Sequence, residues 1–525
     1  MKLNLSQSLQ DQLRETVNEL ASNGVASRIA RKDFTLWGKD AESEASIRLG
    51  WTDSARTSLA VIPEVIELKA EFASAGINRI VLCGMGGSSL APEVITKTAG
   101  VELVVLDSTE PSQVISALID LERTAVVVSS KSGSTVETDS QKRAFESAFE
   151  SAGIDPLSRI VIVTDPGSPL DQTSRTAGYR VFNADPNVGG RYSALTAFGL
   201  VPSGLAGADI SGLLAAANRV SSALQSDGID NPALWLGAAL AVSPSSSGVK
   251  DKFLIETDDL PGFGDWAEQL VAESTGKLNR GILPVVVTSS APELGLALDD
   301  TLKFSFSSLA PHGQDGTFFG ELGELFLLWE YATVIAGYLM EINPFDQPNV
   351  ESAKIAARTL LDSPAIASAP DFTDRGIEVK SYGFDILGST VEAALDQIIA
   401  MGDDQSYFSI HAYLNRSELP QFEKLRDLLA SKTSRPVTFG WGPRFLHSTG
   451  QYHKGGPRQG LFIQLTTEAT TDLEIEGRPF SFGTLIAAQA AGDARVLQEN
   501  GLPVVTLKLG SPLQDLQLIE QVIRS

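Results

Sequence analysis

The stretch Val126-Val-Val-Ser-Ser-Lys-Ser-Gly-Ser-Thr-Val-Glu-Thr138 decides the fold class of this chain. An apolar run, typical of a buried strand, leads into a loop with five hydroxyl side chains, one lysine and one glycine, and a helical pattern follows from Val136. At the start of such a helix, free backbone N–H groups and the positive end of the helix dipole point at the loop and stabilise an anion there. The stretch therefore predicts a phosphate-binding loop, in which Lys131 adds positive charge.

A second loop of the same kind lies upstream, at Leu82-Cys-Gly-Met-Gly-Gly-Ser-Ser-Leu90. Its glycines permit a tight turn and a close approach of the backbone to a ligand, although glycine turns after strands are also common for structural reasons alone. The loop has neither the Gly-Lys-Ser/Thr ending of a Walker loop nor the Gly-x-Gly-x-x-Gly pattern of a dinucleotide site. Two such loops on one sheet indicate a phosphorylated small molecule held between them.

Short apolar runs alternate with helical patterns from Arg79 onward. This alternation is typical of mainly parallel sheets with helices on both faces, so we expect an α/β fold with two doubly wound domains. Loops that follow parallel strands share one edge of the sheet, where ligands bind in such folds. We expect a helical segment, a first α/β domain with the phosphate-binding loops, a second α/β region and a C-terminal α/β extension, over residues 1–75, 76–245, 246–370 and 371–525.

The composition excludes several classes of protein. A net charge of −24 argues against a nucleic-acid partner, which would require a basic surface. The most apolar long stretch, Leu325–Met340, contains Glu330 and is shorter than a membrane span, so we expect a core helix and no membrane partner. The N-terminus lacks an apolar signal core and the single cysteine, Cys83, excludes an internal disulfide, so we expect a cytoplasmic protein.

Charged side chains in three further motifs are candidates for chemistry. Arg191 follows two glycines, and its guanidinium could hold an oxyanion by two hydrogen bonds; a structural ion pair is the alternative. Gln269 and Glu273 are four residues apart and therefore share a helix face, so Glu273 is a candidate general base, against the plainer interpretation of a solvated carboxylate. Lys354 lies near the start of a helix, where a solvated lysine is the default.

Two of the four histidines lie close together, in Leu446-His-Ser-Thr-Gly-Gln-Tyr-His453. Glycines and hydroxyls surround them, as in a loop that wraps a ligand, and histidine carries protons near neutral pH. A zinc site would need three or four ligands, so one remote cysteine and no His-Glu-x-x-His argue against a metal.

Together these segments resemble the phosphoglucose isomerases, whose two domains have the sugar-isomerase (SIS) fold. The most specific matches are Asn343-Pro-Phe-Asp-Gln-Pro-Asn-Val-Glu351 and Ala272-Glu-Ser-Thr-Gly-Lys277, whereas the glycine loop is shared with other sugar-phosphate binders. The matching segments run from about residue 80 to about residue 455. The chain is most similar to the isomerase half of bacterial transaldolase/phosphoglucose isomerase fusions. Residues 1–75 are too few for a transaldolase barrel, so we expect no transaldolase activity.

The resemblance implies a glucose-6-phosphate isomerase, an aldose–ketose isomerase of glycolysis and gluconeogenesis that uses no metal or other cofactor. Glu273 would move a proton between C1 and C2 through a cis-enediol, and Arg191 would stabilise the enediolate. His447 and Lys354 would help open the sugar ring. The residues that would surround the substrate and its phosphate are Gly87, Ser88, Ser130, Lys131, Ser132, Ser134, Thr135 and Gln269.

The order of the motifs departs from the family's pattern. In the family, the catalytic histidine usually stands between the glutamate and the lysine motifs and crosses from a partner subunit. Here the histidine motif follows Lys354, so His447 is the candidate, with His453 as its nearest rival. We therefore expect a homodimer, or a monomer in which the C-terminal extension supplies the histidine to its own chain.

Two other functions remain open at this stage. The enzyme could also isomerise mannose 6-phosphate, which a competition assay with both sugars would test. Alternatively, a protein with the same fold could bind sugar phosphates without turnover, but such a protein would be expected to lose its base and its lysine, and this chain has both Glu273 and Lys354.

Overall fold

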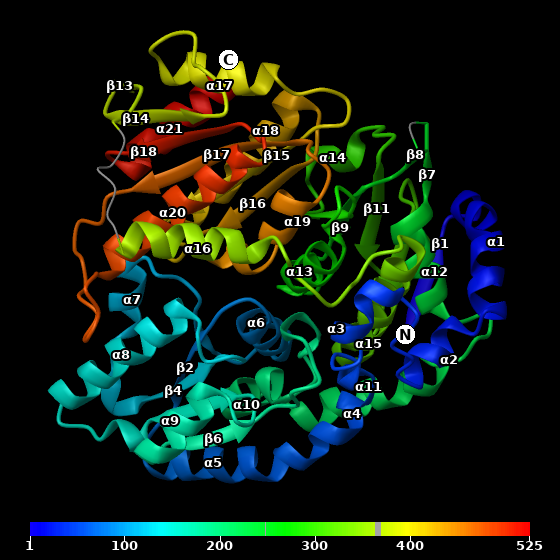
Figure 1. The fold of residues 1–525 in the computed structure, drawn as a ribbon, viewed down its shortest axis with the longest axis horizontal. Helices are drawn as coiled ribbons and strands as arrows, with labels where there is room; N and C mark the ends of the chain where they lie inside the picture. Colours follow the sequence, from blue (N-terminus) through cyan, green and yellow to red (C-terminus); the bar gives the residue numbers. More distant parts are fainter. Residues whose placement is uncertain (247, 363–368) are drawn as a thin grey trace.

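The apolar runs between residues 79 and 183 form the first sheet of the chain (Figure 1). We describe a computed structural model, in which residues 1–246, 248–362 and 369–525 are described. The five strands are all parallel in the order β3-β2-β4-β5-β6. They are β2 (Arg79–Gly84), β3 (Val104–Leu106), β4 (Thr124–Ser129), β5 (Ile160–Thr164) and β6 (Arg180–Asn183). The helices of this lobe are α5 (Ile62–Ser74), α6 (Gly87–Ala99), α7 (Pro111–Ala117), α8 (Val136–Ser151), α9 (Pro169–Ala177) and α10 (Ala197–Ala206).

The order of these strands creates a switch point. After β2 the chain crosses to β3 on one side, and it then returns to β4 on the other side of β2. The loops that follow β2 and β4 therefore diverge from neighbouring strands, and a crevice forms between them at the carboxyl edge of the sheet. Both predicted phosphate-binding loops lie at this point.

A second sheet combines one strand from the N-terminus of the chain with four strands between residues 252 and 319. Its order is β1-β12-β11-β9-β10, with β1 antiparallel and the other pairs parallel. The strands are β1 (Lys2–Leu5), β9 (Lys252–Glu256), β10 (Leu283–Val287), β11 (Thr301–Phe306) and β12 (Gly316–Phe319). The helices of this lobe include α1 (Gln7–Ser22), α11 (Ile210–Leu224), α12 (Pro232–Val242), α13 (Phe263–Thr275) and α15 (Leu322–Leu339). The helical pattern expected from residue 1 is thus wrong for its first residues, which pair with the distant β12.

The C-terminal part has a sheet and a hydrophobic core of its own (Figure 1). The order is β13-β14-β18-β17-β15-β16, and the four strands from β18 to β16 are parallel. They are β13 (Phe372–Asp374), β14 (Ile377–Tyr382), β15 (Tyr407–Tyr413), β16 (Val437–Trp441), β17 (Gly460–Thr467) and β18 (Val504–Leu509). The helices are α17 (Val391–Ala400), α18 (Lys424–Thr433), α19 (Gly450–Gly455), α20 (Phe482–Glu499) and α21 (Pro512–Arg524). The predicted α/β class with mainly parallel sheets is confirmed.

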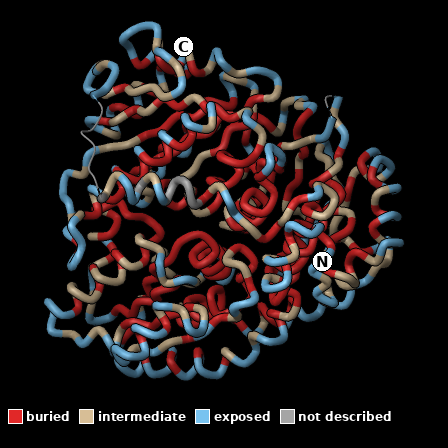
Figure 2. The backbone as a smooth tube through the Cα atoms, viewed as in Figure 1, coloured by how far each residue is buried: buried red, intermediate tan, exposed pale blue. Residues whose placement is uncertain are grey.

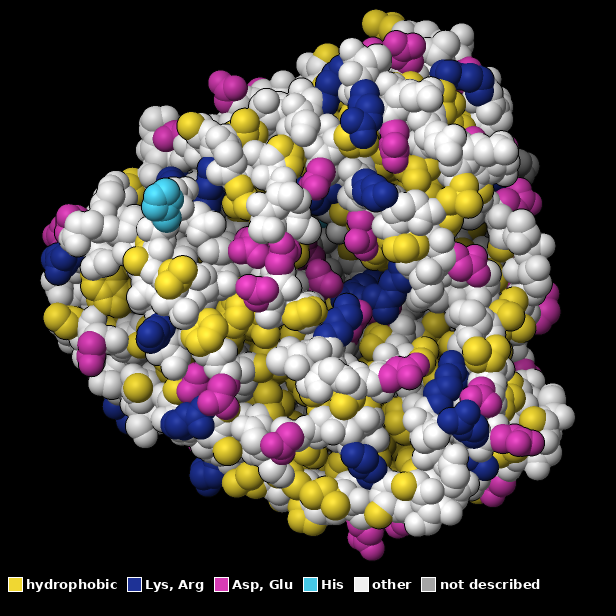
Figure 3. All heavy atoms as spheres, turned by 180° about the vertical axis from the view of Figure 1, so that it is seen from behind, with side chains coloured by type: hydrophobic (Ala, Val, Ile, Leu, Met, Phe, Trp, Pro, Cys, Tyr) yellow, Lys and Arg dark blue, Asp and Glu magenta, His cyan; other side chains and the backbone are white. Residues whose placement is uncertain are grey.

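Each of the three lobes has a buried centre, and ion pairs join the C-terminal lobe to the first lobe. Buried backbone fills the centre of each lobe, whereas exposed backbone lies mainly on the outside (Figure 2). Figure 3 shows the back of the molecule, hollowed between the lobes, with Lys and Arg side chains inside the hollow and Asp and Glu side chains beside it. Arg444 of the C-terminal lobe pairs with Glu93 and Asp107 of the first lobe, at 2.6 and 3.1 Å. These buried ion pairs fix the C-terminal lobe against the first sheet.

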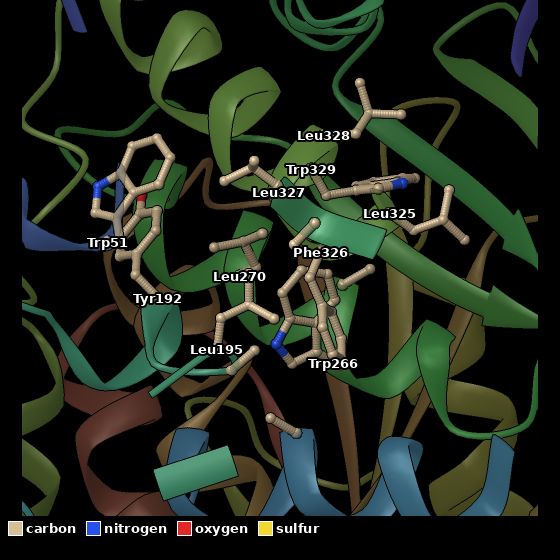
Figure 4. Packing of buried hydrophobic residues seen from close by; sticks show 14 of the residues in the cluster. Trp51, Tyr192, Leu195, Trp266, Leu270, Leu325, Phe326, Leu327, Leu328 and Trp329 are labelled. Carbon is tan, nitrogen blue, oxygen red and sulfur yellow. The ribbon is translucent and has the colours of Figure 1, made fainter. Parts of the chain in front are cut away.

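The core of the second lobe holds two segments of the site. Figure 4 shows Trp266 beside Phe326 of α15 and Trp51 beside Tyr192, with ring centroids 4.6 and 5.7 Å apart. The Tyr192 hydroxyl lies 2.9 Å from the Ser274 hydroxyl at the end of α13. Because the aromatic core anchors both residues, it also fixes their neighbours in the sequence, Arg191 and Glu273.

Helix α15 is long and apolar enough to cross a membrane, but 89% of that window is buried inside the protein. It packs against α11, α12 and α13 in the second lobe. The prediction of a core helix for this stretch is confirmed.

Glu330, in the middle of α15, leads to a prediction about stability. Its side chain is 1% exposed, and both carboxyl oxygens lack a hydrogen-bond partner among the described residues. Burial raises the pKa of Glu330 well above its usual range. A raised pKa in the folded state contributes stability below the unfolded pKa of about 4.3, and this contribution is lost as the pH rises toward the folded pKa. We expect Glu330→Gln to be increasingly stabilising between pH 5 and pH 8, by roughly 1 kcal/mol for each pH unit until the folded pKa is reached.

Urea unfolding of both proteins at pH 5, 6.5 and 8 measures this difference. Glu15→Gln on the exposed face of α1 is the matched control and should show no such trend. A difference in unfolding free energy that stays constant with pH would contradict the prediction.

Candidate active site

Four segments that are far apart in the sequence meet at the glycine loop after β2. Gly86 adopts a φ of +57°, and a Cβ there would lie 2.8 Å from the His447 carbonyl oxygen and 2.9 Å from Nε2 of Gln269. A Cβ on Gly87, the first residue of α6, would lie 2.0 Å from the carbonyl oxygen of Gly190. Only glycines allow this approach, so the loop brings the segments of Arg191, Gln269 and His447 together.

The hydroxyl loop after β4 forms the second side of the crevice. The Ser130 hydroxyl accepts a hydrogen bond from the N–H of Gly133 at 3.2 Å, and the Ser132 and Ser134 hydroxyls lie 2.8 Å apart. Thr135 is the N-cap of α8, but its side chain makes no capping hydrogen bond. The N-terminus of α8 follows the loop directly, so the positive end of its dipole lies at the loop, as the sequence pattern predicts. Ser88 is buried in the first turn of α6.

Lys131 has a partner that the sequence did not identify. Its ammonium group lies 2.5 Å from a carboxyl oxygen of Asp165, in the loop after β5. Burial lowers the pKa of Lys131, and the ion pair with Asp165 opposes this shift. The charge of Lys131 is thus partly compensated by Asp165.

Glu273 is a buried carboxylate near the C-terminal end of α13. Its side chain is 8% exposed, and Oε2 accepts a hydrogen bond of 3.0 Å from Nε2 of Gln269, one helical turn earlier. The same nitrogen of Gln269 lies 2.8 Å from the His447 carbonyl oxygen. The structure thus confirms the shared helix face, and Glu273 is not the solvated surface carboxylate that the pattern alone favoured.

Arg191 lies against Glu273. Its Nε is 3.6 Å from Oε2 of Glu273, and Nη1 donates a hydrogen bond of 3.1 Å to the Glu273 carbonyl oxygen. Further hydrogen bonds reach the carbonyl oxygens of Phe345 and Asp346 and the amide oxygen of Gln347, at 3.1, 3.2 and 2.8 Å. The guanidinium therefore holds the Asn343–Pro348 junction beside the carboxylate, as the ion-pair interpretation expects, and its role toward an oxyanion stays a prediction.

His447 reaches this region from the C-terminal lobe. It ends the 3₁₀ turn η8 (Arg444–His447), which follows β16 at the carboxyl edge of the parallel strands. Its Nε2 lies 3.0 Å from Oε1 of Glu137, and the histidine side chain is 13% exposed. Glu137 stands in the first turn of α8, beside the hydroxyl loop. A carboxylate that accepts from an imidazole fixes the orientation of the ring.

Comparison with known proteins connects this geometry to a family. The family model for phosphoglucose isomerase matches residues 67–283, which include both loops, Arg191 and Glu273. Residues 67–283 of this chain are therefore similar to phosphoglucose isomerases. A probable glucose-6-phosphate isomerase from Haloarcula marismortui is 29% identical over 343 residues, which cover 55% of this chain and 79% of the relative. A glucose-6-phosphate isomerase from Rippkaea orientalis is 36% identical over 205 residues, or 37% of this chain and 39% of the relative.

Solved structures show the same fold. A hypothetical protein from Thermus thermophilus superposes with a TM-score of 0.57 at 24% identity, covering 69% of this chain and all of that protein. A glucose-6-phosphate isomerase from Chlamydia trachomatis superposes with a TM-score of 0.53 at 18% identity, covering 69% of this chain and 86% of that protein. The chain thus shares its fold with both solved proteins over about two thirds of its length.

The second histidine of the motif lies elsewhere. His453 is 2% exposed and lies 2.9 Å from the Tyr407 hydroxyl, within the core of the C-terminal lobe. Burial, together with His411 and Lys454 beside it, lowers the pKa of His453 well below its usual range. Of the two candidate histidines, the structure brings only His447 to Glu137 and Gln269.

Two lysines, Lys354 in α16 (Val350–Asp362) and Lys277 just after α13, belong to the segments around the Asn343–Pro348 junction. The side chain of Lys354 lies outside the described residues. Lys277, which the sequence analysis did not single out, donates to the carbonyl oxygen of Asn343 and to a carboxyl oxygen of Asp346, at 2.7 and 2.6 Å. Burial lowers the pKa of Lys277 to about 8. Its contacts hold the junction that leads into α16.

Residues 1–246, 248–362 and 369–525 contain no group of three or more His, Cys, Asp or Glu side chains placed to hold a metal ion. The groups that the fold brings together are a carboxylate, a guanidinium, an imidazole and a hydroxyl-rich loop. This set can move protons on a bound phosphorylated sugar.

Proposed function

We propose that this protein is a glucose-6-phosphate isomerase that interconverts glucose 6-phosphate and fructose 6-phosphate, with Glu273 as the base. The observation that carries the proposal is the buried Glu273 carboxylate, hydrogen-bonded to Gln269 and 3.6 Å from Arg191. A carboxylate shielded from water and held in one orientation is suited to proton abstraction next to a carbonyl group. The named relatives with this activity support the same reaction.

The open-chain sugar would be anchored by its phosphate. Bound at the switch point, the phosphate would accept hydrogen bonds from the hydroxyl loop and from the start of α6. The sugar chain would then extend toward α13 and Arg191. The proposed phosphate and substrate ligands are Gly87, Ser88, Ser130, Lys131, Ser132, Ser134, Thr135 and Gln269.

The proposed chemistry is a proton transfer between neighbouring carbons. Glu273 removes the C2 proton of glucose 6-phosphate, the electron pair forms the C1–C2 double bond, and negative charge builds up on the carbonyl oxygen. Arg191 stabilises this enediolate, an effect typically worth a few kcal/mol. Protonated Glu273 then returns the proton to C1 while the hydroxyl proton of O2 passes to O1, which yields the C2 ketone of fructose 6-phosphate. His447 and Lys354 transfer protons at O1 and O5 when the ring opens.

One chain is proposed to hold a complete site. Gln269 contacts the side chain of Glu273 and the backbone of His447 within the same chain. A monomer could therefore be active, without a histidine from a partner subunit. The cytoplasmic location expected from the sequence stays a prediction.

An assay that couples fructose 6-phosphate conversion to a glucose-6-phosphate dehydrogenase tests the reaction. We expect turnover that EDTA does not change, because protein side chains alone carry the proton transfers. Absence of turnover in well-folded protein would reject the proposed function, and loss of turnover on chelation would reject the metal-free mechanism.

A further inference from the structure

Glu137, the partner of His447, is held from a second side. Its Oε1 accepts one hydrogen bond from His447 Nε2, at 3.0 Å, and a second from Nε2 of Gln489, at 2.7 Å. The amide oxygen of Gln489 in turn accepts from the hydroxyl of Thr109, at 2.6 Å. A continuous chain of hydrogen bonds therefore runs from Thr109 through Gln489 and Glu137 to His447.

The direction of each hydrogen bond in this chain is determined by chemistry. An ionised carboxylate can only accept, so the amide nitrogen of Gln489 must face Glu137 and its amide oxygen must face Thr109. The Thr109 hydroxyl then donates. With both ends of the amide occupied, Gln489 cannot flip without breaking two hydrogen bonds.

This chain is shielded from water. Gln489, Thr109 and Glu137 are 3%, 0% and 5% exposed. Hydrogen bonds in such surroundings are electrostatically stronger than in water, and a donor that is lost there is not replaced by solvent. The orientation of the Glu137 carboxylate thus depends on Gln489.

The members come from different lobes. Thr109 follows β3 and Glu137 begins α8, both in the first lobe, whereas Gln489 lies on α20 of the C-terminal lobe. The local sequence around it, Ile486-Ala-Ala-Gln-Ala-Ala-Gly492, is otherwise apolar and small. A single amide in such a segment, directed at a charged group of another lobe, has a specific polar role rather than a packing role.

We propose that Gln489 is a positioning residue for the His447–Glu137 pair. It fixes the carboxylate of Glu137, which in turn holds the imidazole of His447 in the orientation required for proton transfer during ring opening. The expected change in kcat rests on the proposed function. The expected change in the orientation of His447 does not.

Gln489→Met tests the proposal, because methionine nearly preserves the shape of glutamine and removes its donor. We expect kcat for glucose 6-phosphate to fall by about 10- to 100-fold, since a small misplacement of a proton-transfer group has an effect of this size. KM should stay near the parent value, because Gln489 makes none of the described contacts with the phosphate loop. The ring N–H proton resonance of His447 should shift or broaden; its assignment follows from its absence in His447→Gln, in a chain with only four histidines.

Gln464→Met is the matched control. Gln464 is equally buried in the C-terminal lobe and donates to the carbonyl oxygen of Ala490 on α20, so its loss weakens the anchoring of the same helix without touching Glu137. A second pair of variants changes Thr109, the residue at the far end of the hydrogen-bond chain from His447. Thr109→Val removes the hydroxyl that donates to Gln489, and Thr109→Ser keeps it. We expect Thr109→Val to reproduce the effect in weaker form and Thr109→Ser to behave as the parent.

Each outcome decides the proposal. It is overturned if Gln489→Met leaves kcat and the His447 resonance unchanged, or if Gln464→Met changes both to the same extent. If Gln489→Met fails to fold, the Thr109 pair decides by the same two measurements. If the parent protein shows no isomerase turnover, the proposed function fails, and the resonance of His447 still reports whether Gln489 positions the histidine.

Discussion

Glu273→Gln is expected to lower kcat by more than about 10³ with little change in KM. Glutamine keeps the size of the side chain and can still contact Gln269, so the helix and the site should remain folded. It cannot accept a proton from carbon, which removes the base while the phosphate anchor stays intact. The coupled assay with glucose 6-phosphate and fructose 6-phosphate measures the effect in both directions.

Glu268→Gln is the matched control for this experiment. Glu268 lies on the same helix, α13, but it lines a separate cleft together with Arg444 and Glu93. The same chemical change is made there five residues away, and activity should stay close to the parent value. Near-normal turnover of Glu273→Gln, or an equal loss in Glu268→Gln, would exclude Glu273 as the base.

The second large effect is expected at His447. His447→Gln should lower kcat by about 10² or more, because it removes a proton carrier at the site. His453→Gln should leave kcat near the parent value but destabilise the fold by about 1–3 kcal/mol, since a buried hydrogen bond to Tyr407 is lost. Kinetics with ring-closed glucose 6-phosphate and urea unfolding measure the two effects separately. The reverse pattern would assign the catalytic role to His453.

The same variants decide whether one chain completes the site. We expect a mixture of Glu273→Gln and His447→Gln, prepared by co-expression, to stay as inactive as its components, because each chain supplies its own glutamate and histidine. In a dimer whose sites are shared between subunits, about a quarter of the sites would recover both residues. Recovered activity in the mixture would therefore show that the histidine crosses between subunits.

Much of the first lobe could be predicted from local patterns. The apolar runs, the hydroxyl loop and the start of α8 are encoded within about twenty residues, and strand, loop and helix N-terminus are properties of such short segments. The spacing of Gln269 and Glu273 likewise depends only on the helical repeat. These predictions are local, and the structure agrees with them where it describes these residues.

Contacts between distant segments could not be predicted. Asp165 pairs with Lys131, β1 pairs with β12, and His447 contacts Glu137 across 310 residues of sequence. Glu137 lies inside the most informative stretch of the chain, yet nothing in that stretch indicates a histidine partner. Contacts of this kind depend on how the lobes pack, for which a single sequence holds no periodic signal.

The sequence by itself determined that this protein has a hydroxyl-rich loop between a parallel strand and a helix N-terminus, and a glutamate and a glutamine on one helix face, because both follow from backbone geometry within a few turns. Only the tertiary structure decided which histidine lies beside Glu137 and Gln269. His453 is buried and hydrogen-bonded to Tyr407, whereas the turn after β16 carries His447 to Gln269 and Glu137. The physical reason is that proton transfer requires atoms within hydrogen-bond reach, and the packing of three lobes sets that distance.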